Sequence, residues 1–255
     1  MHGRYLSIMG SCNGFLCMAS ERSPNPAIIC NPITREQICL PESVPDFPFF
    51  DHHIGLGYDL STKKYKVVRM YMDNSEFNRF QIITLGESSW RQLDAPYRVL
   101  FWGIVGPIYC EGALYWIIDK VSHSVGNEYI LVLDLSDEEF RTITIPSNIR
   151  MPRLMHVWRV ISNRGRNCMV HHYTCDMYVH WNVFSRPVLV SMLGEDSFLL
   201  EVSKFGLHWE RDLVQYFPQM RQYYNLKIDR LPTWFRSICF SPNLISPHSV
   251  LFHVV

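Results

Sequence analysis

The sequence of 255 residues carries 24 basic and 24 acidic side chains, so its formal net charge is zero, and 47% of its residues are hydrophobic. This composition excludes a disordered or fibrous chain, and the balanced charge gives no general attraction to nucleic acid or to an acidic membrane surface. The chain is long enough to bury a substantial core as one domain or as a repeat array.

The first 19 residues predict a β-hairpin rather than a secretion signal, because polar residues such as Ser7 and Ser11 interrupt any apolar stretch. The segment 11–14 contains Asn13 and Gly14, and glycine supplies the positive φ that a tight turn needs. No stretch approaches the roughly 18 apolar residues that a membrane-spanning helix requires, so no such helix is predicted.

A longer turn signature then recurs along the chain. It begins at Asn31, Asp59 and Asp134, and looser copies begin at Thr84 and Phe217. Asn and Asp start such turns because their side chains accept hydrogen bonds from the turn's own backbone. In four of the five copies an aromatic residue follows six positions later: Tyr65, Trp90, Phe140 and Tyr223. In chain order the five copies begin at residues 31, 59, 84, 134 and 217, so successive copies are 28, 25, 50 and 83 positions apart. These distances are close to one, one, two and three units of about 25 to 28 residues, which indicates a repeat architecture.

Apolar segments beside these turns, such as 27–30, 65–70 and 129–133, predict strands. Further tight turns with glycine are predicted at 110–112, 162–165 and 193–196. A tight hairpin followed by a long hairpin makes four strands in roughly 50 residues, the size of one propeller blade. We therefore predict an all-β fold, a β-propeller of four-stranded blades.

The eight cysteines follow no disulfide-scaffold spacing and include no Cys-x-x-Cys pair. In a chain of this size the pattern predicts free thiols of a reducing compartment, and so a cytoplasmic or nuclear protein.

The sharpest candidate for a metal site is the group of Cys168, His171, His172 and Cys175, with His180 nearby. Two thiolates and two imidazoles would suit zinc. However, residues 167–174 predict a strand, whose alternation would place these side chains on opposite faces of the sheet. No metal site and no cofactor are predicted.

Three further kinds of site are considered: a dinucleotide-binding loop, a pair of catalytic carboxylates and a catalytic nucleophile. The pair Gly55 and Gly57 lacks the third glycine and the following helix of a dinucleotide loop, so these glycines predict close packing within a strand. The acidic segment 137–139 is interpreted as a solvated turn. No local nucleophile signature such as Gly-x-Ser-x-Gly is present, and no enzyme activity is predicted.

Ordered motifs over nearly the whole chain resemble the plant F-box-associated domain. The motifs that carry the resemblance are Gly10–Cys17, Cys30–Arg35, Gly55–Asp59, Lys64–Val68, Ser89–Arg91, Gly112–Trp116, Leu133–Arg141, Phe198–Val202, Asn225–Ile228 and Leu231–Phe235. The resemblance implies a kelch-like propeller that acts as the substrate receptor of an SCF-type ubiquitin ligase. In that family an N-terminal F-box docks on the Skp adaptor and the associated domain holds the protein to be ubiquitinated.

The chain departs from the family pattern in two places. Only nine residues precede Gly10, so we expect one domain over residues 1–255 without F-box helices, and partnership with the Skp adaptor and cullin only if an F-box lies upstream. Family members also carry Trp-Val-Met and Glu-Ser-Trp motifs after the strand that corresponds to residues 168–173. These motifs are missing here, which predicts an incomplete or distorted blade around residues 175–190.

We expect protein contacts in the irregular segments 95–104, 119–128, 146–156 and 203–211, because loops of a rigid scaffold commonly carry recognition. The candidate contact residues are Arg98, Trp102, His123, Arg153, Trp158, His208 and Trp209. Two other hypotheses are a propeller enzyme or lectin that acts on glycans, and a truncated decoy receptor without ligase activity.

Overall fold

The computed structural model describes residues 6–20, 23–43, 52–72, 78–95, 106–118, 129–144, 154–163, 166–176, 184–193, 197–204, 211–220, 222–230 and 237–251. The chain forms two compact units, Met1–Ser147 with Phe240–Val255, and Asn148–Cys239. The described residues form β-strands and one 3-10 turn, Ser249–Leu251, and none of them belongs to a helix long and apolar enough to cross a membrane.

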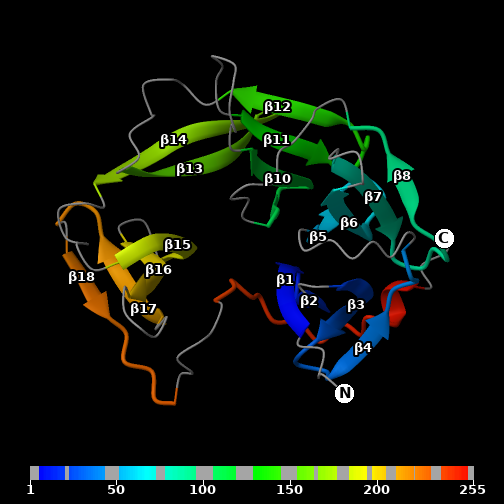
Figure 1. Ribbon diagram of the computed structural model, residues 1–255, viewed down its shortest axis with the longest axis horizontal. Helices are drawn as coiled ribbons and strands as arrows, with labels where there is room; N and C mark the ends of the chain where they lie inside the picture. Colours follow the sequence, from blue (N-terminus) through cyan, green and yellow to red (C-terminus); the bar gives the residue numbers. More distant parts are fainter. Residues whose placement is uncertain are drawn as a thin grey trace. The chain divides into compact units, whose positions relative to one another are not determined.

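The first unit contains three four-stranded antiparallel sheets, and in each of them the strands are neighbours in chain order (Figure 1). Sheet A consists of β1 (Leu6–Cys12), β2 (Phe15–Ser20), β3 (Ser23–Asn31) and β4 (Glu36–Cys39). Sheet B consists of β5 (His52–Asp59), β6 (Lys64–Met72), β7 (Asn78–Thr84) and β8 (Arg91–Leu93). Sheet C consists of β9 (Ile108–Cys110), β10 (Ala113–Ile118), β11 (Tyr129–Asp134) and β12 (Phe140–Thr144).

The second unit contains one two-stranded and one four-stranded sheet. Sheet D consists of β13 (Leu154–Asn163) and β14 (Arg166–Asp176). Sheet E consists of β15 (Phe184–Leu193), β16 (Ser197–Lys204), β17 (Arg211–Phe217) and β18 (Gln222–Asn225). The predicted all-β fold of four-stranded sheets is confirmed. Sheet D, at the place of the predicted incomplete blade, has two strands among the described residues, and residues 177–183 lie outside them.

The three copies of the recurring turn that begin with Asn or Asp share one geometry. Asn31, Asp59 and Asp134 each accept a hydrogen bond from the backbone N–H two residues later, with distances of 2.9, 2.8 and 2.9 Å. The fifth residue of each turn has a positive φ: Arg35 at 64°, Lys63 at 59° and Glu138 at 58°. For these three copies the turn prediction is therefore confirmed, down to the hydrogen bonds of the first side chain.

Gly57 in β5 shows why this strand needs glycine. A Cβ atom at Gly57 would lie 2.4 Å from a methyl group of Leu135 and 2.8 Å from the ring of Tyr109. At Gly55 it would lie 2.6 Å from the ring of Pro107. The predicted close packing is confirmed, and it brings sheet C against sheet B.

Two apolar clusters hold the first unit together. One joins sheets A and B around Phe15, Ile29 and Val67, and the other joins sheets B and C around Phe80 and Trp116. The rings of Phe80 and Trp116 meet edge to face with centroids 5.6 Å apart, a favourable aromatic arrangement. The six cysteines whose side chains are described are free thiols, as predicted: Cys12, Cys17, Cys30, Cys39, Cys110 and Cys239.

Candidate functional site

The seven predicted contact residues stay predictions, because none of their side chains belongs to the described part of the chain. Arg98, Trp102, His123, Arg153, His208 and Trp209 lie outside the described residues. Trp158 lies within β13, where its backbone pairs with that of His171, and only the backbone of this residue is described. Segment 146–156 was expected to be irregular throughout, but β13 begins at Leu154.

Cys168, His171, His172 and Cys175 fall on β14, which confirms the strand predicted there, and His180 lies outside the described residues. The partner of Val157 is Tyr173 and the partner of Trp158 is His171, so His172 is the extra residue of a β-bulge. The pairing is regular from Cys168 to His171, so the predicted alternation holds between these two positions, and the bulge interrupts it only beyond His171. Among the described side chains, which do not include those of β14, no group of His, Cys, Asp and Glu is suited to a metal ion, and the candidate group on β14 is not tested.

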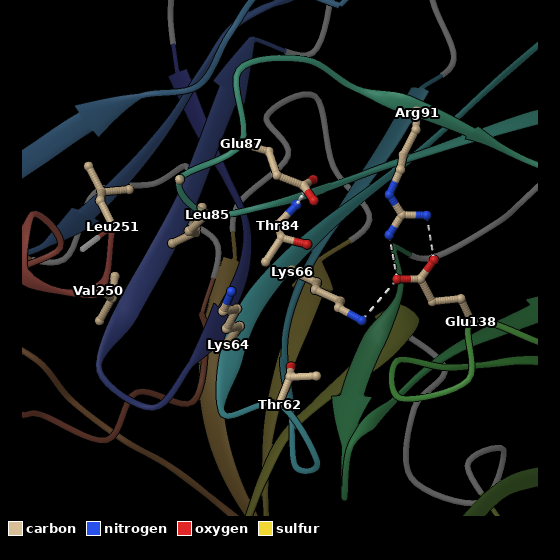
Figure 2. Close-up of a pocket in the computed structure, with 11 residues that line it drawn as sticks. Thr62, Lys64, Lys66, Thr84, Leu85, Glu87, Arg91, Glu138, Val250 and Leu251 are labelled. Atoms are coloured by element: carbon tan, nitrogen blue, oxygen red, sulfur yellow. Dashed lines mark hydrogen bonds and ion pairs between the residues drawn. The ribbon is translucent and has the colours of Figure 1, made fainter. Parts of the chain in front are cut away.

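A hollow of about 340 Å³ lies in the first unit, between sheets B and C and the C-terminal segment (Figure 2). Such a volume is in the lower part of the range that small-molecule and side-chain binding sites occupy. Its lining combines charged, hydroxyl and apolar side chains: Thr62, Lys64, Lys66, Thr84, Leu85, Gly86, Glu87, Arg91, Glu138, Val250 and Leu251.

Asp59 is the innermost charged residue of a network of charged side chains at this hollow. The Asp59 carboxylate is fully buried, and it accepts hydrogen bonds from Ser61 and Thr62 of its own turn. It also accepts one from the Ser136 hydroxyl at 3.0 Å, which joins this turn to the equivalent turn of sheet C. Two copies of the recurring turn thus contact each other directly.

Lys66 connects the buried carboxylate to the hollow. Its ammonium group lies 2.9 Å from Asp59 and 2.9 Å from Glu138, and it donates to the backbone carbonyl of Leu135. The Lys66 side chain is only 7% exposed. Because an isolated buried ammonium is costly, these three acceptors together allow the charge to remain inside the protein.

The protonation of Asp59 is fixed by this environment. Burial opposes the ionised form, but hydrogen bonds from Thr62, Lys66 and Ser61 outweigh it and hold the pKa of Asp59 well below its usual value of 3.8. Asp59 is therefore a permanent negative charge at neutral pH, and it has the role of an anchor for Lys66.

Glu138 and Arg91 close the network on the solvent side. Both carboxylate oxygens of Glu138 accept hydrogen bonds from the Arg91 guanidinium, in a bidentate pair (Figure 2). The hydrogen bond from Arg91 lowers the pKa of Glu138, and the same bond raises the pKa of Arg91. Glu138 is only 18% exposed. The interpretation of segment 137–139 as a fully solvated turn is therefore wrong at Glu138, while Asp137 and Glu139 are exposed.

The C-terminal segment completes the wall of the hollow. Asn31 donates from its side-chain amide to Asn243 Oδ1 at 2.9 Å and to the carbonyl of Ile245 at 2.8 Å. Beyond this anchor, Val250 and Leu251 pack against the core of sheets A and B. The position of this wall depends on contacts between residues more than 200 positions apart, which no local sequence pattern signals.

Comparison with known proteins identifies the family. The F-box associated beta propeller domain family matches residues 1–182. Among curated relatives from Arabidopsis thaliana, F-box protein At3g07870 is 24% identical over 93% of this chain and 69% of its own length. F-box protein CPR1 is 26% identical over 56% of this chain and 40% of its own length, and F-box protein At5g49610 is 28% identical over 55% and 42%.

The chain thus spans about two fifths of the length of two of these relatives and about two thirds of the third. The family match covers all of the first unit up to Ser147 and extends into sheet D. The antiparallel sheets of this chain, its repeated turns and the family of these relatives all indicate the same kind of domain. The chain belongs to the F-box associated beta propeller domain family.

Proposed function

We propose that this domain is the substrate-recognition part of an F-box protein and holds a target protein for ubiquitin transfer by an SCF-type ligase. The family match over residues 1–182 carries the proposal, and it is supported by relatives that are F-box proteins. In this role the domain contributes reversible contacts, and the transfer of ubiquitin is carried out by other subunits.

The charged groups at the hollow support a role in binding rather than in acid or base catalysis. A general base needs a pKa near the working pH and access to a substrate proton. The pKa values of Asp59 and Glu138 are instead lowered, and both carboxylates are engaged by neighbouring cations. We therefore propose a non-catalytic domain, located in the cytoplasm or the nucleus.

The test uses the full chain in two forms, alone and fused behind the F-box of At3g07870. Proteins recognised by the domain are expected to decrease in abundance with the fusion, and to recover when the proteasome is inhibited. The chain alone is expected to protect the same proteins, because it would occupy them without the ligase. Quantitative proteomics measures both effects.

Two results would contradict the proposal. One is a fusion that binds the Skp adaptor but changes the abundance of no protein. The other is a chain that binds purified glycans on an array with a defined sugar preference, which would favour a lectin.

A further inference from the structure

Lys64 differs from the other cations at the hollow. Lys64 and Lys66 are two positions apart on β6, so their side chains leave the same face of sheet B. Lys66 is paired with Asp59 and Glu138, and Arg91 is paired with Glu138. Lys64 is exposed, and among the described residues no carboxylate forms an ion pair with it.

Glu87, the other carboxylate of the lining, is engaged elsewhere. Its Oε2 atom accepts a hydrogen bond from the backbone N–H of Thr84 at 2.8 Å. Its negative charge also acts on Arg91, whose pKa it helps to raise after the larger effect of Glu138. The carboxylates of the lining are therefore engaged by Arg91, by Lys66 and by a backbone N–H, and Lys64 is the cation that remains for a ligand.

An apolar wall stands beside Lys64. Leu85, Val250 and Leu251 line the same hollow, and Figure 2 shows the Lys64 side chain directed into the space that they border. Gly86 at the turn has a φ of +103°, and a Cβ atom there would lie 2.9 Å from the carbonyl oxygen of Leu251. The turn at Gly86 and the C-terminal segment at Leu251 are thus in close contact, and this contact fixes the shape of the hollow at one end.

We propose that this hollow binds an acidic side chain of a protein segment, with Lys64 pairing with the carboxylate and an adjacent apolar side chain packing on Leu85, Val250 and Leu251. Acidic side chains are the most common carboxylates on protein surfaces, and a volume of about 340 Å³ accommodates one or two side chains. The inference rests on the proposed function and names the chemistry of the recognised segment. A charged hydrogen bond fixes orientation, and the apolar contact adds binding energy.

The test measures binding of short fluorescent peptides with a central Asp-Leu pair to the full chain, by fluorescence polarisation. Peptides with Lys-Leu, with phosphoserine-Leu, or with Leu at a free C-terminus serve as comparisons. Asp-Leu peptides are expected to bind about tenfold more tightly than Lys-Leu peptides, the size of effect that one hydrogen bond to a charged group gives. A preference for phosphoserine or for the chain end over Asp would overturn the proposal.

Matched variants locate the binding. Lys64→Gln is expected to lose the preference for Asp-Leu, whereas Lys63→Gln, which removes the same charge at the neighbouring turn position outside the lining, should retain it. Lys64→Glu is expected to reverse the preference towards Lys-Leu. Equal losses with Lys63→Gln and Lys64→Gln would overturn the proposal, because the peptide would then respond to general charge.

The outcome is separable from that of the proposed function. The peptide measurement needs neither the Skp adaptor nor a ligase. If the F-box fusion depletes target proteins and Lys64→Gln depletes them equally, recognition lies elsewhere on the domain and only the present inference fails. If peptides bind as expected and no protein is depleted, the ligase role fails while the binding site stands.

Discussion

The turns that begin at Asn31 and at Asp59 share one backbone geometry and differ in the partner that each one holds. Both side chains are fully buried, and both accept the N–H of the residue two positions later. The amide of Asn31 can also donate, and it binds carbonyl groups of the C-terminal segment. The carboxylate of Asp59 can only accept, and it binds Lys66 and three hydroxyl groups. The side-chain chemistry limits the choice of partner, because an amide can donate to a backbone carbonyl whereas a carboxylate can only accept.

The largest effect is expected from Asp59→Asn, which keeps the shape of the side chain and removes its charge. Lys66 would lose one of its two carboxylate partners in a site where its side chain is only 7% exposed. Breaking a buried ion pair from one side typically costs about 3 to 5 kcal/mol of unfolding free energy. Urea denaturation of the variant and the wild type measures the difference, and a loss below about 1 kcal/mol would contradict the role of Asp59 as an anchor.

The reverse exchange, Asn31→Asp, is expected to have the next largest effect. The new carboxylate could still accept from Ile33 N–H but could not donate to the carbonyl of Ile245. Leaving buried polar groups unpaired costs about 1 to 3 kcal/mol. Because the contact holds the C-terminal segment, limited proteolysis should cleave within residues 240–251 faster than in the wild type. Unchanged cleavage there would show that Val250 and Leu251 hold the segment without Asn31.

The two turns should also differ in their dependence on pH. The pKa of Asp59 is lowered on folding, so its contribution to stability is complete above the unfolded value near 3.8 and is lost as the pH falls below it. Glu138 contributes with the same sign. Unfolding free energies measured from pH 7 to pH 3 should therefore fall less steeply at the acid end for Asp59→Asn than for the wild type. Parallel curves would contradict the lowered pKa.

The smallest effect is expected from Asp134→Asn, at the third turn of the series. Asp134 accepts the N–H of Ser136, but it forms no ion pair among the described residues. Asn accepts the same hydrogen bond, so the loss should stay below about 1 kcal/mol. This variant is the matched control for Asp59→Asn, and equal losses at the two positions would show that turn formation, rather than the buried ion pair, sets the cost.

The repeated turns and the strands between them could be predicted from the sequence because their chemistry is local. Asx side chains bind backbone groups two residues away, and Gly14 and Gly112 take positive φ values within their own hairpins. The need for glycine at position 57 could also be anticipated from its place in a strand, although its neighbour Leu135 could not.

The hollow could not be predicted, because it depends on which separate segments meet. By sequence Glu138 resembles a solvated residue of an acidic turn, but its side chain is mostly buried because Arg91 and Lys66 of another sheet converge on it. Lys64 and Val250 are far apart in the sequence and share no pattern. The contact residues predicted from loop composition stay predictions, since they lie in parts of the chain outside the described residues or, at Trp158, on a strand without a described side chain.

The return of the C-terminal segment to sheet A has a consequence for synthesis on the ribosome. Asn31 and Asn243 are 212 positions apart, yet they belong to the same compact unit. At about 5 to 20 residues per second, the donors of Asn31 wait roughly 10 to 40 s for their acceptors to be made. The last strand of the first unit ends at Thr144, so Asn31 is expected to remain without these acceptors while the whole second unit, Asn148–Cys239, is being made.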